Sequence, residues 1–184
     1  REIYAHIGGK SPLLAETNRQ AAALAAALSD IGTVRVFPCM RYWHPFSRQV
    51  VQEVQAFQPD EVILLPLYPQ FSTATSESSL TDWRRAAAVA GLTGRSRSIG
   101  CYPIAPDWIA AQARLIGQSL TTAAVAGPVR LLLSAHGLPK RGVEAGDPYQ
   151  WQVEQTCAAV IARLAELGWP DLDHVICYQS RVGP

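Results

Sequence analysis

The sequence has few cysteines, and none of them shows the spacing of a metal-binding knuckle. Its four cysteines are far apart and form no C-x-x-C pair: Cys39, Cys101, Cys157 and Cys177. Isolated cysteines among apolar neighbours, as at Cys157 and Cys177, are typical of buried thiols in a reducing compartment. We therefore expect reduced thiols, and no zinc or iron–sulfur site built from these residues.

Long apolar runs and runs of one charge are also missing. The longest apolar stretches have the length of a strand, which is too short for a membrane-spanning helix. Lys and Arg number 16 against 15 Asp and Glu, and no basic run is interleaved with aromatic residues. Nucleic-acid binding therefore has no electrostatic support. Because the opening residues show no signal-peptide pattern either, we expect a cytoplasmic location.

The chain is rich enough in apolar residues to fold, but its ends look abrupt. Hydrophobic residues make up 48% of the 184 positions and charged residues 17%, a composition typical of globular proteins. No initiator methionine precedes Arg1, and the last four residues follow directly on a predicted strand. We expect from this that parts of a longer protein are missing at both ends.

Apolar runs of strand length alternate with segments of helical periodicity. This alternation predicts an α/β fold with parallel sheets flanked by helices. The expected strands are 34–37, 62–65, 98–101, 129–133 and 174–177, and the expected helices are 11–28, 76–90, 106–123 and 148–167, with one more beginning at Pro45. Two prolines interrupt the chain between Tyr102 and Pro106, where we expect a domain boundary that separates 1–103 from 104–184.

Polar and aromatic residues cluster directly after the predicted strands. Ligands of open α/β sheets bind beyond the carboxyl ends of the strands, so these clusters are candidates for a site. They are 41–44, 68–70, 134–137 and 178–181. The cluster at 134–137 follows an apolar run, Leu131–Leu133, which we expect to be a buried strand that leads to His136 at the edge of the sheet. Histidine exchanges protons and binds transition metals near neutral pH, although a hydrogen-bonded core histidine fits the local pattern equally well.

Asp147, which follows this histidine in the sequence, has a structural role that needs no catalytic site. Asp147 followed by Pro148 and then by Gln150 is a typical start of a helix, with the aspartate as cap. We therefore expect helix capping as the main role of Asp147.

Five segments, in order, resemble the ferrochelatase family, and together they span the chain from Tyr4 to Pro184. They are Tyr4 with Ile7–Pro12, Arg41–Pro45, Leu67–Ser79, Ser134–Tyr149 and Tyr178–Pro184. The resemblance implies two Rossmann-like domains, of which 1–103 and 104–184 are incomplete parts, with a porphyrin cleft between them. It also implies a metal-binding and proton-accepting role for His136, and contacts to the porphyrin from Tyr4, Ser11, Arg41 and Tyr42. The acidic residue that faces this histidine in the family would lie beyond Pro184.

The resemblance further implies the substrates and the absence of a resident cofactor. Ferrous iron and protoporphyrin IX would be the substrates, with protohaem and two protons as products, and peripheral contact with the inner face of the membrane fits the family. Thr73 stands where some animal-type relatives carry a cluster cysteine, so no iron–sulfur cluster is expected. Lys10 stands where many relatives have a third glycine, which alters the early loop because glycine alone reaches positive φ at little cost.

Three other functions are alternatives to this one. A chelatase for coproporphyrin or for another metal stays within the same chemistry, and a non-catalytic tetrapyrrole- or metal-binding module needs no opposing acid. A nucleotide-binding domain fails, because Ile7–Ser11 lacks the upstream glycine of a phosphate loop and no strand is visible before it.

Overall fold

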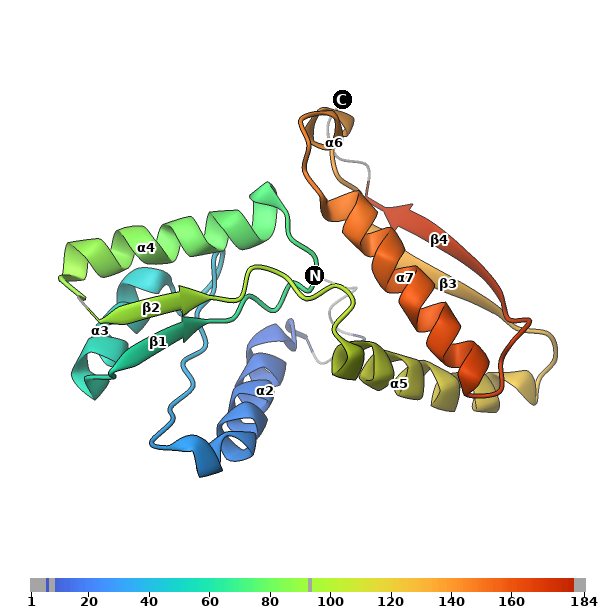
Figure 1. Ribbon diagram of the computed structural model, residues 1–184, viewed down its shortest axis with the longest axis horizontal. Coiled ribbons are helices and arrows are strands. Elements are labelled where there is room, and N and C mark those ends of the chain that lie inside the picture. Colours follow the sequence, from blue (N-terminus) through green and yellow to red (C-terminus); the bar gives the residue numbers. More distant parts are fainter. Residues whose placement is uncertain (1–5, 7–8, 93, 181–184) are drawn as a thin grey trace. The chain divides into compact units, whose positions relative to one another are not determined.

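The computed structural model describes residues 6, 9–92 and 94–180. Helices and short strands alternate along these residues (Figure 1), which confirms the predicted α/β class. The chain divides into two compact units, Arg1–Val62 with Thr81–Ser96 and Ile63–Leu80 with Arg97–Pro184.

The first unit is built mainly of helices. Helix α2 spans Leu13–Ala27 and is followed by a short 3-10 turn, η1, at Ser29–Ile31; helix α3 spans Ser47–Phe57. Val50, Val51 and Val54 bury one face of α3, as the helical spacing predicts. Most of helix α4 (Ser78–Ala90) belongs to the same unit, and its last carbonyl accepts a hydrogen bond from the Gln55 side chain of α3 at 3.1 Å.

A two-stranded sheet joins β1 (Glu61–Leu64) to β2 (Arg95–Ser98), and Figure 1 shows both strands running in the same direction. The loop after β1 leads into η2 (Thr73–Glu77), a single turn of π-helix that continues into α4. Such turns often occur at functional sites.

The second unit contains the longer sheet. Strands β3 (Arg130–His136) and β4 (Asp173–Gln179) pair in parallel over seven residues each. Helices α5 (Pro106–Ala124) and α7 (Tyr149–Glu166) pack beside them, and the short α6 (Lys140–Glu144) follows β3. A parallel pair needs such a crossover connection, which here passes through α6 and α7.

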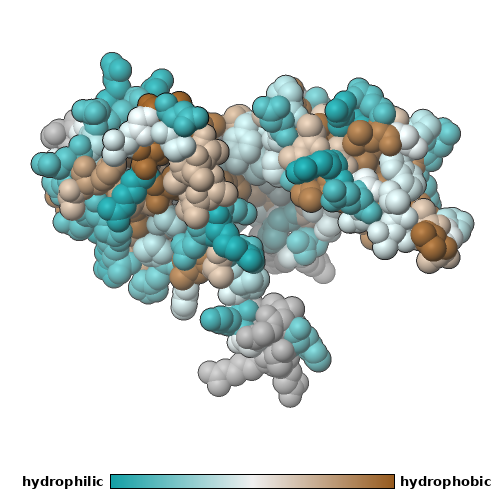
Figure 2. Space-filling model, turned by 90° about the horizontal axis from the view of Figure 1, so that it is seen from below, coloured by the Kyte–Doolittle hydropathy of each residue, from teal (hydrophilic) through white to brown (hydrophobic). Residues whose placement is uncertain are grey.

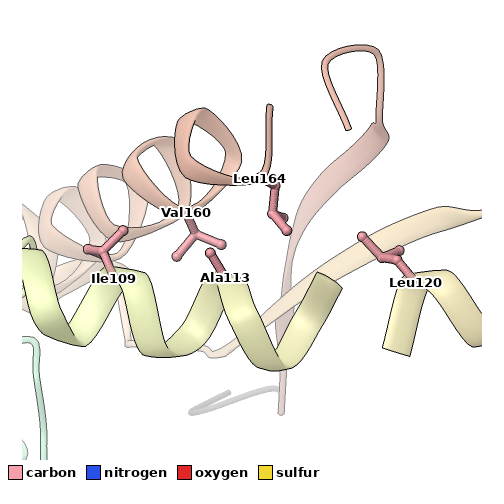
Figure 3. Close-up of a cluster of buried hydrophobic side chains, with 5 residues drawn as sticks. All are labelled: Ile109, Ala113, Leu120, Val160 and Leu164. Atoms are coloured by element: carbon pink, nitrogen blue, oxygen red, sulfur yellow. The ribbon is translucent and has the colours of Figure 1, made fainter. Parts of the chain in front are cut away.

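The core of this unit lies between α5 and α7. Figure 3 shows Ile109, Ala113 and Leu120 of α5 near Val160 and Leu164 of α7. Ala113 and Leu164 are fully buried. Leu131 of β3 packs against this cluster, so the hydrophobic core also fixes the strand that leads to His136.

Most predicted elements are confirmed, but one strand is wrong and another is shifted. Residues 34–37 form no strand. A strand needs a neighbour for its backbone hydrogen bonds, and within the described residues this stretch has none. The strand expected at 98–101 lies at Arg95–Ser98 instead, because four polar residues pair there although no apolar run marks them.

The surface mixes polar and apolar residues. Apolar residues reach the surface among hydrophilic ones on the face in Figure 2. Within the described part of the chain, no helix combines the length and the apolar character needed to cross a membrane.

Candidate functional site

His136 is the last residue of β3, as the sequence predicts. The strand alternates between half-buried and exposed side chains, with Leu131, Leu133 and Ala135 on the inner side and His136 exposed. His136 stands opposite Gln179 in the parallel register, at the carboxyl end of both strands. The histidine is therefore not a core residue, and its ring is accessible at the sheet edge where ligands bind in such folds.

One ring nitrogen of His136 is already engaged. Its Nδ1 lies 2.8 Å from the carbonyl oxygen of Gly137. A carbonyl oxygen only accepts hydrogen bonds, so Nδ1 carries the proton when the ring is neutral. The lone pair then resides on Nε2, which can bind a metal ion or accept a proton.

Gly137 allows a close approach of the two strand ends. Its N–H donates to the Gln179 carbonyl at 2.7 Å. A Cβ atom on Gly137 would lie only 2.7 Å from the carbonyl oxygen of Ser180 and 3.2 Å from that of Gln179. Since both neighbours are backbone atoms, only glycine fits here without a shift of one strand end.

A groove of about 380 Å³ lies beside His136. It is lined by Gly137, Leu138, Lys140, Val143, Glu144, Tyr149, Gln150 and Tyr178. Burial raises the pKa of Tyr149, although a hydrogen bond from the His136 backbone N–H opposes this. Burial also raises the pKa of Tyr178, and the negative charge of Glu154 adds to it. Both phenols are therefore neutral near pH 7, and both side chains belong to residues that line the groove.

Asp147 precedes the N-cap residue of helix α7, Pro148, and its side chain bonds to the first N–H of the helix, which fits the predicted capping role. It also makes contacts that the sequence did not reveal. Its Oδ1 accepts the Tyr149 N–H at 3.0 Å. Its Oδ2 accepts the Ser72 hydroxyl at 2.9 Å, the Thr73 N–H at 2.9 Å and the Thr73 hydroxyl at 2.8 Å. The carboxylate thus joins the start of α7 to the start of η2.

A second set of polar contacts continues this junction along α7. The buried Gln152 accepts the Phe71 N–H at 2.7 Å, and Gln70 donates to the Thr156 hydroxyl at 2.9 Å. Thr156 in turn donates to the carbonyl oxygen of Pro103 at 2.7 Å. The sequence did not predict these contacts between α7 and residues 70–71 and 103. The one signal in the sequence was that Gln152 and Thr156 lie on the inner face of an amphipathic helix.

The hydrogen bonds of Asp147 give a testable pH dependence. Burial raises its pKa, but the hydrogen bonds from Thr73, Tyr149 and Ser72 outweigh burial, and the pKa lies below its ordinary value of 3.8. Because the pKa of Asp147 is lower in the folded than in the unfolded protein, the ionised carboxylate stabilises the fold at pH values above the unfolded-state pKa. This stabilisation is lost as the pH falls through the folded-state pKa.

We expect Asp147→Asn to lower the free energy of unfolding of the full-length protein by about 1–2 kcal/mol at neutral pH. An amide has one acceptor oxygen, so either the Ser72–Thr73 donors or the Tyr149 N–H lose their partner. The difference from wild type should shrink below pH 3.8. Urea unfolding at several pH values measures it.

Asp173→Asn is the matched control for this variant. Asp173 forms an exposed ion pair with Arg130 at 2.6 Å, at the other end of the sheet, and such pairs contribute about 0–1 kcal/mol. An Asp147→Asn difference that does not depend on pH, or that equals the effect of Asp173→Asn, would contradict the expectation.

The other predicted site residues lie at the start of the chain and in the first unit. Tyr4 lies outside the described residues. Ser11 is exposed, and its hydroxyl accepts the Leu13 N–H at 3.3 Å at the start of α2. The guanidinium of Arg41 lies 4.8 Å from the ring centroid of Tyr42, which is 68% exposed. His136 belongs to the second unit.

Arg41 also lines a groove of the first unit, between α3 and α4. This groove has a volume of about 520 Å³ and contains two further arginines, Arg48 and Arg85. Asp82 pairs with Arg85 at 3.2 Å within it. An arginine-lined groove favours carboxylate or phosphate groups, which guanidinium binds in a bidentate manner.

Neither unit contains a ready-made multidentate metal centre in the described part of the chain, where no group of three or more His, Cys, Asp or Glu side chains converges. His136 can therefore supply one metal ligand at the end of β3, and no second His, Cys, Asp or Glu of the described residues forms a three-residue group with it.

The chain is similar to known proteins over its whole length. The family model for ferrochelatase matches residues 1–184. A ferrochelatase of Phenylobacterium zucineum is 50% identical over 98% of this chain and 52% of its own length. Those of Caulobacter vibrioides and of a Wolbachia from Drosophila simulans are 49% and 45% identical, over 51% and 58% of their lengths. The chain thus spans about half the length of these curated relatives. It belongs to the ferrochelatase family.

Proposed function

We propose that this chain is part of an enzyme that inserts Fe²⁺ into protoporphyrin IX to form protohaem, the last step of haem biosynthesis. The observation that carries the proposal is His136, an exposed histidine at the carboxyl end of a parallel strand with Nδ1 bonded to the Gly137 carbonyl. Membership of the ferrochelatase family over the whole chain supports it.

The proposed chemistry needs a group that handles both protons and metal. A free porphyrin carries two pyrrole N–H protons that must leave before iron occupies the ring. The Nε2 atom of neutral His136 is suited to accept such a proton, and it is equally suited to bind Fe²⁺ briefly. A single imidazole ligand holds iron weakly, which favours its transfer to the four nitrogens of the porphyrin.

Porphyrin binding is proposed for Tyr4, Ser11, Arg41 and Tyr42, and the catalytic and metal-binding role for His136. The stacked pair of Arg41 and Tyr42 supports this, because an exposed aromatic ring suits the face of a porphyrin and a guanidinium suits its propionates. The division into Rossmann-like domains at 1–103 and 104–184 stays a prediction.

The proposal also covers cofactors, partners and location. Ferrous iron acts as substrate, and neither a resident cofactor nor an iron–sulfur cluster is part of the proposal. Its partners would be the porphyrin and iron, not nucleic acid. A cytoplasmic location, with peripheral contact at the inner face of the membrane, belongs to the same proposal.

The test uses the full-length protein under anaerobic conditions. Protoporphyrin IX and coproporphyrin are offered separately with Fe²⁺, and with Zn²⁺ as a second metal, while absorbance follows binding and metal insertion. We expect insertion of Fe²⁺ into protoporphyrin IX. Preference for coproporphyrin or for zinc would reassign the substrate, and porphyrin binding without any insertion would indicate a binding module.

A further inference from the structure

The loop after β1, residues 66–71, is held by partners that are distant in sequence. Its first half is bonded to one tyrosine of the segment that follows β2. The Pro66 carbonyl accepts the Tyr102 hydroxyl at 3.1 Å, and the Pro69 carbonyl accepts the Tyr102 N–H at 2.8 Å. Loop and tyrosine belong to the same unit, and two bonds to one residue hold this half of the loop in place.

Helix α7 holds the second half of the loop. The side chain of Gln152 is buried, and its Oε1 accepts the Phe71 N–H at 2.7 Å. One turn further along α7, the Thr156 hydroxyl accepts a hydrogen bond from Gln70 Nε2 at 2.9 Å and donates to the Pro103 carbonyl at 2.7 Å. This single hydroxyl therefore joins α7, the loop after β1 and the segment after β2.

These bonds give Gln70 a role that the sequence did not predict. The cluster at 68–70 is a candidate for ligand binding because it follows the carboxyl end of β1. The amide nitrogen of Gln70 is bonded to Thr156, so this side chain supports the loop from within the cluster. A loop that is ordered before its ligand arrives saves the free energy of ordering it on binding.

We propose that Thr156 and Gln152 are positioning residues that hold the loop in the conformation that binds the porphyrin, an inference that rests on the proposed function. Without the Thr156 hydroxyl, the Gln70 amide and the Pro103 carbonyl lose a shared partner. The loop then occupies its binding conformation for only part of the time, and the apparent affinity falls by that fraction. None of these bonds involves His136, so the insertion step itself is preserved once porphyrin is bound.

The experiment compares Thr156→Val with Thr156→Ser in the full-length protein. Valine keeps the shape of threonine without the hydroxyl, and serine keeps the hydroxyl. Thr121→Val is the control, because the exposed Thr121 hydroxyl donates within its own helix, to the Gly117 carbonyl at 3.0 Å. Quenching of porphyrin fluorescence gives the Kd for protoporphyrin IX. We expect Thr156→Val to raise it roughly five- to tenfold, as the loss of one hydrogen bond does. The other two variants should stay within about twofold of wild type, and kcat should stay within about twofold in all three.

A second variant tests the same bond without touching α7. Gln70→Leu removes the amide that donates to Thr156, and it should also raise the Kd. Since both changes break one bond, the double variant should raise the Kd by clearly less than the product of the two single effects. Effects that multiply would overturn the proposal, because the two side chains would then act independently.

Hydrogen exchange gives a readout that needs neither porphyrin nor turnover. Mass spectrometry follows the exchange of peptides that cover 66–73, where the Phe71 N–H is protected by Gln152. We expect faster exchange of these peptides in Thr156→Val than in wild type, Thr156→Ser or Thr121→Val.

Unchanged exchange in Thr156→Val, or faster exchange with an unchanged Kd, would overturn the positioning role. A wild-type protein that binds protoporphyrin IX but inserts no iron would contradict the proposed function alone, because the comparison of Kd values still decides whether Thr156 positions the loop. A wild-type protein that binds no porphyrin would overturn both.

Discussion

Replacing His136 with alanine is expected to lower the rate of iron insertion by about 10²- to 10⁴-fold, the usual contribution of a proton-transfer group. The exposed ring at the end of β3 is the group proposed to accept pyrrole protons and to bind iron. Porphyrin binding should persist, because the proposed binding residues lie elsewhere in the chain. Anaerobic absorbance assays on the full-length variant measure both properties.

His174→Ala is a closely matched control for this variant. His174 is also exposed, and its Nδ1 also lies 2.8 Å from a backbone carbonyl, that of Leu172. It stands at the opposite end of the same sheet, paired with Leu131. Equal losses in the two variants, or an active His136→Ala enzyme, would remove His136 from the mechanism.

Substitution of Gly137 by alanine should damage both stability and activity. The new Cβ would lie 2.7 Å from the Ser180 carbonyl oxygen, which is part of the backbone and cannot rotate away. The ends of β3 and β4 must separate, and the bond from Gly137 N–H to Gln179 weakens. We expect a loss of about 1–3 kcal/mol in the free energy of unfolding. Because His136 is the adjacent residue, insertion should also slow by roughly 10- to 100-fold.

Gly142→Ala controls for the substitution itself. Gly142 lies in α6, and its Cβ would meet only the Leu138 side chain, at 3.6 Å, which is an ordinary contact. Alanine in a helix is favourable relative to glycine by about 0.5–1 kcal/mol. Thermal unfolding and insertion assays on both variants test the difference, and a Gly137→Ala protein as stable and active as Gly142→Ala would refute the close-approach argument.

Much of the fold was predictable because its main elements are marked by local patterns. The Ala- and Leu-rich segment of α2 and the amphipathic segment of α7 carry helical periodicity over many residues, and their ends agree with the structure to within about two residues. The apolar run before His136 predicted both the strand and the place of the histidine, but its expected burial is wrong, because Leu131 and Leu133 are half-buried and Leu132 is exposed. These signals depend on neighbours in sequence, so one sequence suffices to read them.

The misses depend on partners that are distant in sequence. The apolar residues 34–37 have strand propensity but find no neighbouring strand within the described residues, whereas the polar residues of β2 pair with β1. Propensity reports the preference of a segment, and pairing decides its structure.

The hydrogen bonds that join Asp147 and α7 to residues 70–73 could not be predicted for the same reason. Asp147 looked like a simple helix cap, because that role needs only its sequence neighbours. Its partner Thr73 lies 74 residues away, and Gln70 lies 86 residues from Thr156. Hydrogen bonds of such sequence separation leave no periodic signal. The family resemblance singles out Thr73 only because some animal-type relatives have a cysteine at this position. Its contact with Asp147 is visible only in the structure.

The decisive measurement is a single turnover of the full-length protein. The protein is loaded with protoporphyrin IX without oxygen and mixed with Fe²⁺, while absorbance follows the porphyrin and a pH indicator follows proton release. We expect haem to form in the protein as two protons leave per porphyrin, and both signals to slow together in His136→Ala by the same factor of about 10² to 10⁴. A folded, porphyrin-loaded protein that forms no haem, or one whose haem formation is untouched by His136→Ala, would contradict the proposed role of this histidine.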